Sequence, residues 1–326
     1  MRQTLVAALA AVLAAACGGS SGSSADLQTQ SKNALPSSSN VKMKGPQSAG
    51  SSADSGALQD SVVGDASGYF VLTVGLSGIV NGAAAVTLGV IEAITASPAT
   101  NCDTTTNTCT WGPGSSALDA NNYKLSVTKQ ADGSFKYGLS GQSKASASGP
   151  FVTFLSGTAI PSGTPHVGSG ELVIDNDARA QLPGASGDTG KVTIDYANTS
   201  QLTISATAIG AKDNDHPGQK INVGYQYANH ADGGGDLDVA FKNTTSLATY
   251  SIHSRWLATG AGRGDAKVTV PVSGGTFSAQ ESECWSAAAS AFKVVYFNSD
   301  DHSKGTSGSA SACAYSDVSF GTVAAP

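Results

Sequence analysis

The residues that could support catalysis are few and scattered along this chain of 326 residues. Its five histidines are isolated from one another, and four of the five stand among Gly, Pro and Asp residues typical of turns. The five are His166, His216, His230, His253 and His302. No Ser-His-Asp set or glutamate pair belongs to a local pattern that would position it for catalysis. We therefore interpret the histidines as solvated loop residues and predict that the protein is not an enzyme. A hydrolase remains a weaker alternative.

Acidic turns raise the question of a calcium site. They are Asp175-Asn176-Asp177, Asp213-Asn214-Asp215 and the run from Asp232 to Asp238, which slightly resembles the glycine-aspartate repeats of secreted calcium-binding proteins. Calcium needs about six to eight oxygen ligands around one point, and these turns neither recur at a regular period nor carry a correctly spaced Glu. Asp, Asn and Gly are also the usual residues of hairpin turns. We expect turns here, with no bound metal and no cofactor.

The amino-terminal 16 residues have the features of an export signal. Arg2 precedes an apolar run from Leu5 to Ala16, which is too short to span a bilayer and ends in small residues. The run from Leu13 to Cys17, Leu-Ala-Ala-Ala-Cys, resembles the lipobox of bacterial lipoproteins. This resemblance implies a signal peptide over residues 1–16, cleavage before Cys17, and lipidation of Cys17 with acyl chains such as palmitate. Because Gly18 rather than Asp follows, it also implies the outer membrane, at its periplasmic face or at the cell surface.

The segment after this cysteine is poor in large apolar residues. Residues 18–58 consist mostly of Ser, Gly, Ala, Gln and Asn, and such a composition buries too little surface to offset the entropy cost of ordering. We expect residues 17–58 to form a lipidated, disordered stalk, followed by one β-rich globular domain over residues 59–326.

Four further cysteines form an even set in a chain predicted to be exported, where oxidation is expected. Cys102 and Cys109 bracket a short polar loop, and Cys284 and Cys313 flank the last predicted strand. Pairing between sequence neighbours is the simplest of the three possible connectivities. We predict the disulfides Cys102–Cys109 and Cys284–Cys313.

The elements that would carry these residues are strands. From Tyr123 to about Pro271, apolar residues repeat at a spacing of two between turn residues, as in Tyr123, Leu125 and Val127. Successive strand residues point to opposite faces, so this spacing predicts a sheet with one buried face, typical of antiparallel meanders. The spacing recurs in Phe135 to Leu139, Leu172 to Ile174, Val192 to Tyr196, Leu202 to Ile204, Ile221 to Tyr227, Leu237 to Phe241, Tyr250 to Ile252, and Val268 to Val270.

An uncharged, apolar segment precedes the strands. Residues 66–91 contain an alanine run at 83–85, and Val86, Val90 and Ile94 follow at helical spacing before Ser97-Pro98. This pattern favours a long buried helix over residues 68–96. A membrane-spanning helix remains possible on length, and a pair of strands remains possible because Val, Thr and Gly are poor helix formers.

The predicted helix would cover the apolar face of the sheet. We expect Ile91 and Ile94 to be buried beside Val192, Ile204 and Val223. The fold class predicted from the sequence is thus α+β, mainly β, with a single large curved antiparallel β-meander packed on one long N-terminal helix. This arrangement loosely resembles uncharacterised secreted lipoproteins, a likeness that carries no activity with it.

The tryptophans and one tripeptide motif have simple structural interpretations. The three tryptophans, Trp111, Trp256 and Trp285, are expected to be large core residues at the edges of the sheet. Arg263-Gly264-Asp265 is the integrin-type tripeptide, and we expect it to form a tight turn after the strand that ends at Trp256.

Charge narrows the range of partners. Lys and Arg total 18 against 24 Asp and Glu, the net charge is −6, and the basic residues form no run. Nucleic-acid binding depends on clustered Lys and Arg, so we predict no nucleic-acid partner. Because a lipid anchor is predicted at Cys17, we expect the membrane to be a partner of this protein.

A curved sheet over a helix can enclose an apolar ligand, as it does in the periplasmic lipoprotein carriers. The sequence therefore favours a non-catalytic, membrane-anchored lipoprotein that binds an apolar ligand or a protein partner through its curved sheet. A structural or adhesion module is the alternative. The sequence does not identify the ligand-binding residues.

Replacing Cys17 with Ser should abolish membrane fractionation, because serine has no thiol to carry the diacylglycerol. Several acyl chains contribute about 0.8 kcal/mol per buried CH₂ to anchoring, so their loss should release the protein or leave an uncleaved precursor. Detergent phase partitioning of wild type and Cys17→Ser measures this. A variant that still partitions like the wild type would show that the lipobox prediction is wrong.

Overall fold

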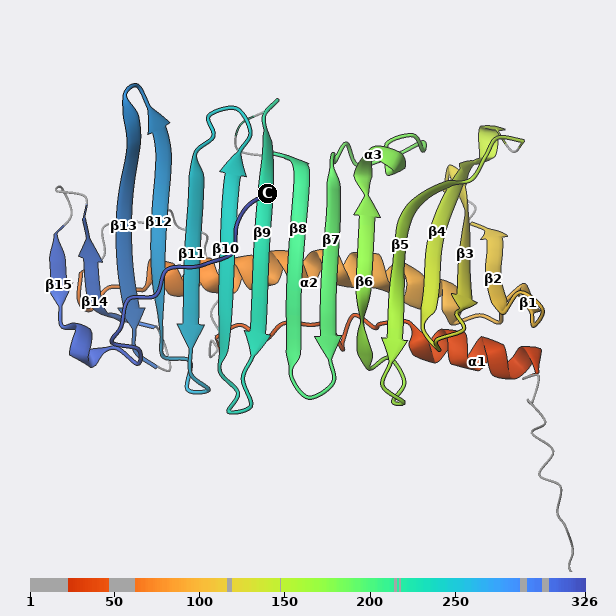
Figure 1. The fold of residues 1–326 in the computed structure, drawn as a ribbon, viewed down its shortest axis with the longest axis horizontal. Helices are drawn as coiled ribbons and strands as arrows, with labels where there is room; N and C mark the ends of the chain where they lie inside the picture. Colours follow the sequence, from red (N-terminus) through yellow and green to blue (C-terminus); the bar gives the residue numbers. More distant parts are fainter. Residues whose placement is uncertain are drawn as a thin grey trace, which may run out of the picture.

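A computed structural model describes residues 23–46, 62–115, 119–146, 148–213, 216, 218–287, 292–300 and 305–326. Within these residues the chain builds one open sheet of 15 strands, and their order across the sheet is their order along the chain. Each neighbouring pair that Figure 1 shows is antiparallel, as between β7 and β8 or between β12 and β13. The predicted mainly-β, antiparallel meander is therefore confirmed.

The strands are β1 (Asn101–Asp103), β2 (Thr108–Gly114), β3 (Asn121–Lys129), β4 (Phe135–Ser143), β5 (Val152–Pro161), β6 (Gly168–Asp175), β7 (Lys191–Asn198), β8 (Leu202–Lys212), β9 (Lys220–Asn229), β10 (Gly235–Asn243), β11 (Thr249–Trp256), β12 (Gly262–Val272), β13 (Gly275–Trp285), β14 (Val294–Ser299) and β15 (Thr306–Gly308). The helices are α1 (Ser24–Ala34), α2 (Gly68–Thr95) and α3 (Asn176–Arg179), with 3-10 turns η1 (Lys144–Ser146) and η2 (Ala310–Ala312).

Alternation of apolar and polar residues assigns each strand two faces. The register places Tyr225 opposite Val239 and Val239 opposite Ile252, so apolar side chains two apart on each strand line up across the sheet. We call the face that carries them the inner face and the opposite one the outer face. Turn residues permit the tight connections: Gly133, with φ +85°, follows Asp132, whose carboxylate accepts a hydrogen bond from the Ser134 amide.

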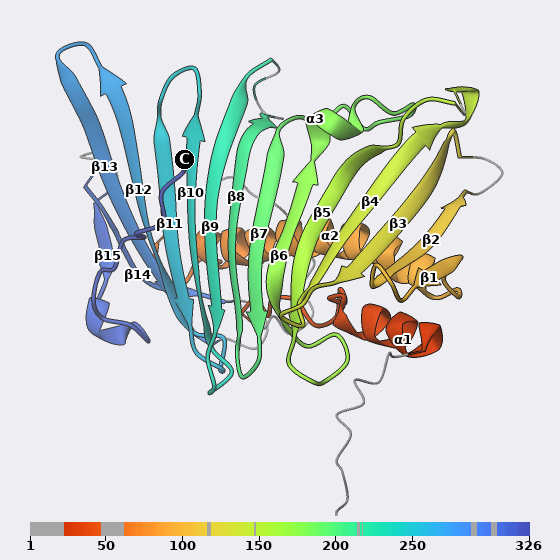
Figure 2. The ribbon, with the colours of Figure 1, turned by 45° about the vertical axis from the view of Figure 1, so that its right-hand side comes forward.

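Helix α2 lies across the inner face, and the sheet bends around it (Figure 2). Ser67 caps the helix by accepting a hydrogen bond from the Phe70 amide. The Glu283 carboxylate of β13 accepts hydrogen bonds from the Ser67 hydroxyl and, at 3.0 Å, from the Tyr69 amide. A buried carboxylate at a helix amino terminus is favoured by the helix dipole, so Glu283 fixes where α2 starts on the sheet.

The segment is a helix, as favoured over a pair of strands, but it is buried along one face only. Leu88 and Ile91 are each 1% exposed, whereas Val90 is 43% exposed. Ile94 is only partly buried, although it does pack against the core. By length and composition, α2 is the one helix among the described residues that could cross a membrane, yet its buried face packs on the sheet.

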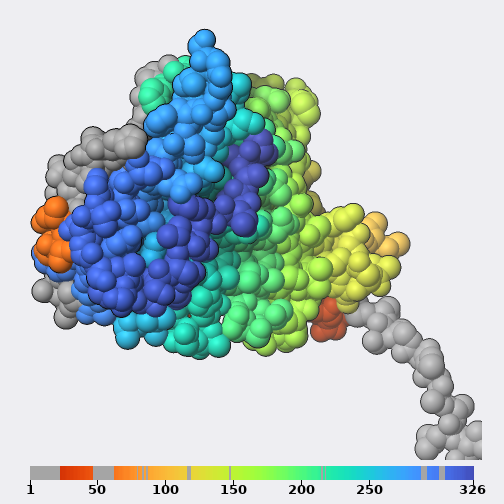
Figure 3. Space-filling model, turned by 60° about the vertical axis from the view of Figure 1, so that its left-hand side comes forward, coloured from red at the N-terminus to blue at the C-terminus, as the bar shows by residue number. Residues whose placement is uncertain are grey.

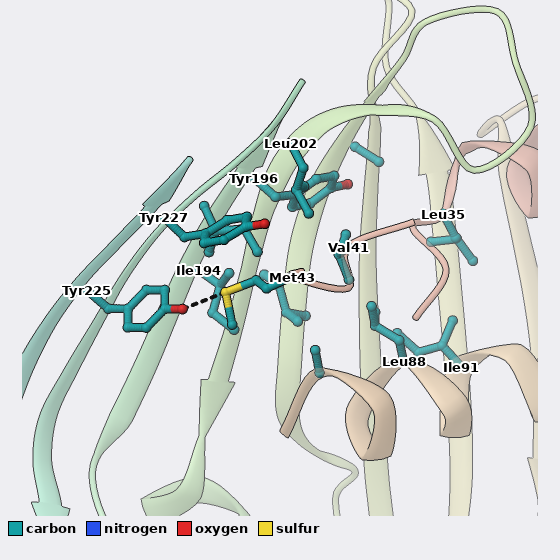
Figure 4. Packing of buried hydrophobic residues seen from close by; sticks show 14 of the residues in the cluster. Leu35, Val41, Met43, Leu88, Ile91, Ile194, Tyr196, Leu202, Tyr225 and Tyr227 are labelled. Carbon is teal, nitrogen blue, oxygen red and sulfur yellow. Dashed lines mark hydrogen bonds between the residues drawn. The ribbon is translucent and has the colours of Figure 1, made fainter. Parts of the chain in front are cut away.

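Helix α2 is not the first helix, which corrects the prediction of one long N-terminal helix. Helix α1 precedes it, and Ser23 opens α1 with a capping box completed by Asp26. Residues 23–46 were expected to belong to a disordered stalk, and for these residues that prediction is wrong. Leu35, Val41 and Met43 are buried against the sheet and α2 (Figure 4).

Hydrogen bonds explain why so polar a segment is ordered. The Asn81 side chain of α2 accepts from the Met43 amide at 2.7 Å and donates to its carbonyl at 3.0 Å. The Tyr227 hydroxyl of β9 accepts from the Lys44 amide at 2.9 Å. The segment after α1 thus runs beside α2 on the inner face with several of its backbone groups paired to distant side chains, which composition alone does not reveal.

Both predicted disulfides are present. Cys102–Cys109 joins the short edge strand β1 to β2, and Cys284–Cys313 joins β13 to the carboxy-terminal segment. The predicted signal peptide, the lipidated Cys17 and the remainder of the predicted stalk at residues 47–58 lie outside the described residues.

Replacing Ile91 with Ala should lower the free energy of unfolding by about 2–5 kcal/mol, the usual range for a large-to-small change in a packed core. Val90→Ala on the exposed side of the same helix is the matched control and should stay within about 0.5 kcal/mol. Urea melts of the two variants compare them directly. Equal midpoints would contradict the packing of α2 on the sheet.

Candidate functional site

On the outer face, the strand register collects polar residues that lie far apart in the sequence. Each residue of this row is the cross-strand partner of the next, from β6 to β13. The row is Glu171, Asp195, Ser205, Gln226, Asp238, His253, Asp265 and Ser282. Sequence analysis missed this row, because only the strand pairing shows which polar positions become neighbours.

Buried charges occupy one end of the row. Asp265 is fully buried on β12 and accepts a hydrogen bond from Nε of Arg263 at 2.8 Å and from a terminal nitrogen of Arg255 at 3.2 Å. The Ser282 hydroxyl donates to the same carboxylate at 2.6 Å. A buried carboxylate needs such partners, since an isolated charge is costly away from water.

This arrangement corrects the prediction for Arg263-Gly264-Asp265. The tripeptide is not a turn but part of β12, and Arg263 and Asp265 are both buried. Gly264 is required there because a Cβ atom at this position would lie 2.5 Å from the Tyr69 ring of α2. The tripeptide is therefore not presented as an exposed loop.

The carboxy-terminal residues 313–326, which we call the tail, lie across the outer face (Figure 3). The Cys284–Cys313 disulfide holds the start of the tail. Further along, Arg255 donates to the Asp317 carboxylate at 3.0 Å, and Asp265 accepts from the Ser319 amide at 3.0 Å. Hydrogen bonding to Arg255 lowers the pKa of Asp317 below its ordinary value.

Beyond these contacts the tail continues over β10 and β9. Asp238 accepts hydrogen bonds from the amides of Thr322 at 2.7 Å and Val323 at 3.0 Å. Asn222 donates to the carbonyl of Pro326 at 2.6 Å. Gly224 lets the tail approach, because a Cβ atom there would lie 2.1 Å from the Ala324 carbonyl oxygen.

A groove of about 520 Å³ opens between the tail and β7 to β11; we call it the outer groove. Its floor includes Asp195, Ser205, Gln226, Asp238 and His253, and Ser319, Phe320 and Thr322 form its tail side. Figure 3 shows the tail crossing the strands beside this region.

A second hollow, of about 340 Å³, lies on the inner face between α2 and strands β10 to β13; we call it the inner groove. Its lining is mostly apolar, with Leu72 and Leu76 from the helix facing Phe241, Ile252, Val268 and Ala279 from the strands. Tyr69 and Glu281 contribute polar groups to this lining. Burial and the neighbouring Glu281 raise the pKa of Tyr69 above its ordinary value.

His166, His216 and His230 lie in loops, as expected, and His216 is exposed, whereas His253 does not fit the prediction of a solvated loop residue. His253 lies within β11, and its Nδ1 donates to the Ser319 carbonyl at 2.9 Å. His230 contacts Asp236 at 2.6 Å, His216 contacts Asp213 at 3.0 Å, and Nδ1 of His166 bonds to the Leu35 carbonyl at 2.8 Å. His302 lies outside the described residues.

The acidic turns are confirmed only in part, because Asp236 and Asp238, the end of the run predicted as a turn, belong to strand β10. Asp175 caps α3 by accepting from the Ala178 amide, and Asp232 accepts from the Gly234 amide in the β9–β10 turn. Asn214 and Asp215 lie outside the described residues. Across the described part of the chain, no group of three or more His, Cys, Asp or Glu side chains is placed to hold a metal ion.

Among the hydrogen bonds of the described residues, none joins a serine hydroxyl to a histidine ring nitrogen. His253 and Asp236 both line the outer groove, but the tail serine beside His253 contributes its carbonyl oxygen and not its hydroxyl. A serine nucleophile needs its hydroxyl within reach of the histidine base. The two grooves offer two kinds of surface, a mostly apolar one on the inner face and one with several polar side chains on the outer face.

The three tryptophans are buried, as predicted. The ring nitrogen of Trp111 donates to the Ser97 carbonyl just after α2, and that of Trp285 donates to the Gly260 carbonyl. Trp256 packs near Tyr227 on the inner face, with ring centroids 6.3 Å apart. None of the three lines either groove.

Comparison of the chain with protein-family models, with curated proteins and with solved structures finds no match. The residues themselves must therefore carry any functional proposal.

Asp265→Asn should lower the free energy of unfolding by about 3–5 kcal/mol, because it leaves two buried guanidinium groups without their shared carboxylate. Asp132→Asn in an exposed turn is the control and should leave the melt unchanged, since Asn keeps the acceptor for the Ser134 amide. Urea denaturation measures both. If Asp265→Asn unfolds at the wild-type midpoint, the buried ion pairs do not hold the tail region together.

Proposed function

We propose that this protein is an exported, membrane-anchored lipoprotein without catalytic activity that binds an apolar ligand in the inner groove. The observation that carries the proposal is the groove itself. About 340 Å³ between α2 and the sheet falls within the range of small-molecule sites, and apolar side chains line most of it.

The position of α2 explains why the groove exists. Glu283 holds the amino terminus of the helix low on β13, so the distal parts of β11, β12 and β13 extend beyond it (Figure 1). Apolar residues continue along these uncovered parts of the inner face. Tyr250 is 51% exposed and Phe277 is 53% exposed.

Large apolar side chains that remain in contact with water next to a preformed hollow mark a binding surface more than a folding requirement. An apolar ligand in the inner groove would extend the buried contacts of Phe241 and Val268, which line it. Polar groups at Tyr69 and Glu281 would suit a ligand with one polar end.

A protein partner is the second candidate, as the sequence also allowed. Val272 and Phe277 stand exposed at the β12–β13 hairpin, beyond the lining of the inner groove. A partner that covered this hairpin could bury both side chains without entering the groove.

The lipobox resemblance supports the remainder of the proposal, which places the protein at the outer membrane with the lipidated Cys17 as its anchor. The two disulfides fit an oxidising compartment outside the cytoplasm. The acidic balance of 24 Asp and Glu against 18 Lys and Arg supports the absence of a nucleic-acid partner.

Ala279→Trp should reduce binding of the apolar dye N-phenyl-1-naphthylamine, because Ala279 lines the inner groove and an indole would fill it. The matched control is Ser278→Trp, the neighbouring position on the outer face, which should bind dye like the wild type. Dye fluorescence titrations measure binding, and thermal melts confirm that both variants fold.

Two outcomes would contradict the proposed function. One is equal dye binding by wild type and Ala279→Trp. The other is native mass spectrometry of the protein purified from its own membrane that shows no co-purifying lipid or other apolar molecule.

A further inference from the structure

Helix α2 is apolar on every side, although only one side packs on the sheet. Residues 66–91 contain no charged residue, and only 27% of the most apolar stretch of the helix is buried. Gly75, Gly78, Gly82, Ala85 and Val90 are exposed on the side that faces away from the strands, which we call the outward face. A helix that is apolar all round is normally covered all round, so the outward face lacks a partner.

The anchor predicted at Cys17 limits where that partner lies. Ser23 caps α1, so only residues 18–22 separate the ordered chain from the cysteine. This length of chain reaches roughly 20 Å when fully extended. The disordered stalk expected over residues 17–58 would have held the domain far from the bilayer, but residues 23–46 are packed on the sheet instead. An anchored protein of this length therefore lies close against the membrane.

The short tether starts beside the carboxy-terminal end of α2 (Figure 1). The Gln28 side chain of α1 accepts a hydrogen bond from the Ala99 amide at 2.9 Å, just after α2 ends. Glu92, near the end of α2, accepts from the Ser38 amide at 2.6 Å, so this carboxylate bonds within the protein. The anchor is thus held near the end of α2 where Val90 is 43% exposed.

Charge indicates which surface the outward face fits. Residues 35–46 and 66–91 contain two lysines, Lys42 and Lys44, and all 24 Asp and Glu residues lie elsewhere in the chain. Val41 and Met43 point into the core, and the lysines that alternate with them are exposed. Anionic lipid headgroups attract lysines beside an apolar surface. A second copy of this face would offer the lysines no acidic partner.

We propose that the outward face of α2, with Lys42 and Lys44, docks on an anionic lipid bilayer, so that the helix lies along the membrane surface. This inference rests on the lipid anchor of the proposed function. Gly and Ala bury little apolar area and two lysines attract weakly, so this face binds only because the anchor keeps its local concentration at the bilayer high. The inner groove, which lies on the same side of the sheet as α2, then faces the membrane.

Fluorescence quenching by brominated lipid tests the docking. The full mature, lipidated protein is reconstituted into vesicles of phosphatidylglycerol and phosphatidylcholine brominated on its acyl chains, and flotation reports whether each variant is anchored. Val90→Trp should lose more fluorescence to this lipid than the wild type, whose three tryptophans are buried. The matched control is Ile209→Trp, at a residue 53% exposed on the outer face, which should be quenched no more than the wild type.

A charge reversal tests the choice of lipid. In the Val90→Trp protein, Lys42→Glu together with Lys44→Glu should reduce the quenching, because Glu is repelled by phosphatidylglycerol. Lys136→Glu together with Lys242→Glu makes the same change of charge on the outer face and should leave the quenching unchanged. Undiminished quenching after the changes at Lys42 and Lys44 overturns the anionic bilayer as the partner.

Flotation separates failure of the docking from failure of the anchor. Equal quenching of Val90→Trp and Ile209→Trp in protein that floats overturns the docking and leaves the proposed anchor standing. A blue-shifted Val90→Trp emission without quenching also overturns the docking, since it shows cover by another protein surface. Wild-type protein that does not float overturns the proposed anchor and this inference with it.

Discussion

A single open sheet has no partner sheet against which to bury its apolar face, and the rest of this structure follows from that constraint. A sheet of 15 strands with alternating faces leaves the whole inner face to be covered by other parts of the chain. Helix α2 and the segment from α1 to residue 46 supply that cover. Together they bury Leu88, Ile91, Leu35 and Met43 in one core with the strands.

Cover by two narrow elements is necessarily incomplete. A helix about 10 Å wide cannot span strands of 9 to 11 residues such as β10, β12 and β13, each of which is roughly 30 Å or more in length. Part of the inner face therefore stays open, and the inner groove lies where α2 ends its contact with β10 to β13. The proposed apolar site is thus a direct result of the way this sheet is covered.

The outer face has to accommodate charged side chains instead of apolar ones. It carries charged residues at positions where two neighbouring strands would otherwise expose them side by side, and the tail converts several of these into buried, paired groups. Asp265 gains the Ser319 amide, and Asp238 gains two amides near residue 322. Where the tail leaves the row, Asp195 and Gln226 remain accessible in the outer groove. One chain segment therefore both stabilises the charged row and forms one side of a groove.

Local patterns in the sequence predicted most of the strands between Tyr123 and Pro271 and favoured the long helix, because a period of two or of 3.6 residues directly reflects which side of an element is buried. They did not predict strands such as β2, β5 and β13. Cysteine spacing likewise gave both disulfides. Three features escaped such patterns. The order of residues 23–46 depends on hydrogen bonds from Asn81 and Tyr227, far along the chain. The burial of Arg263 and Asp265 depends on the tail, and the polar row depends on strand register. These are contacts between distant segments, and only the tertiary structure decides them, because composition and local periodicity carry no information about which distant residues meet.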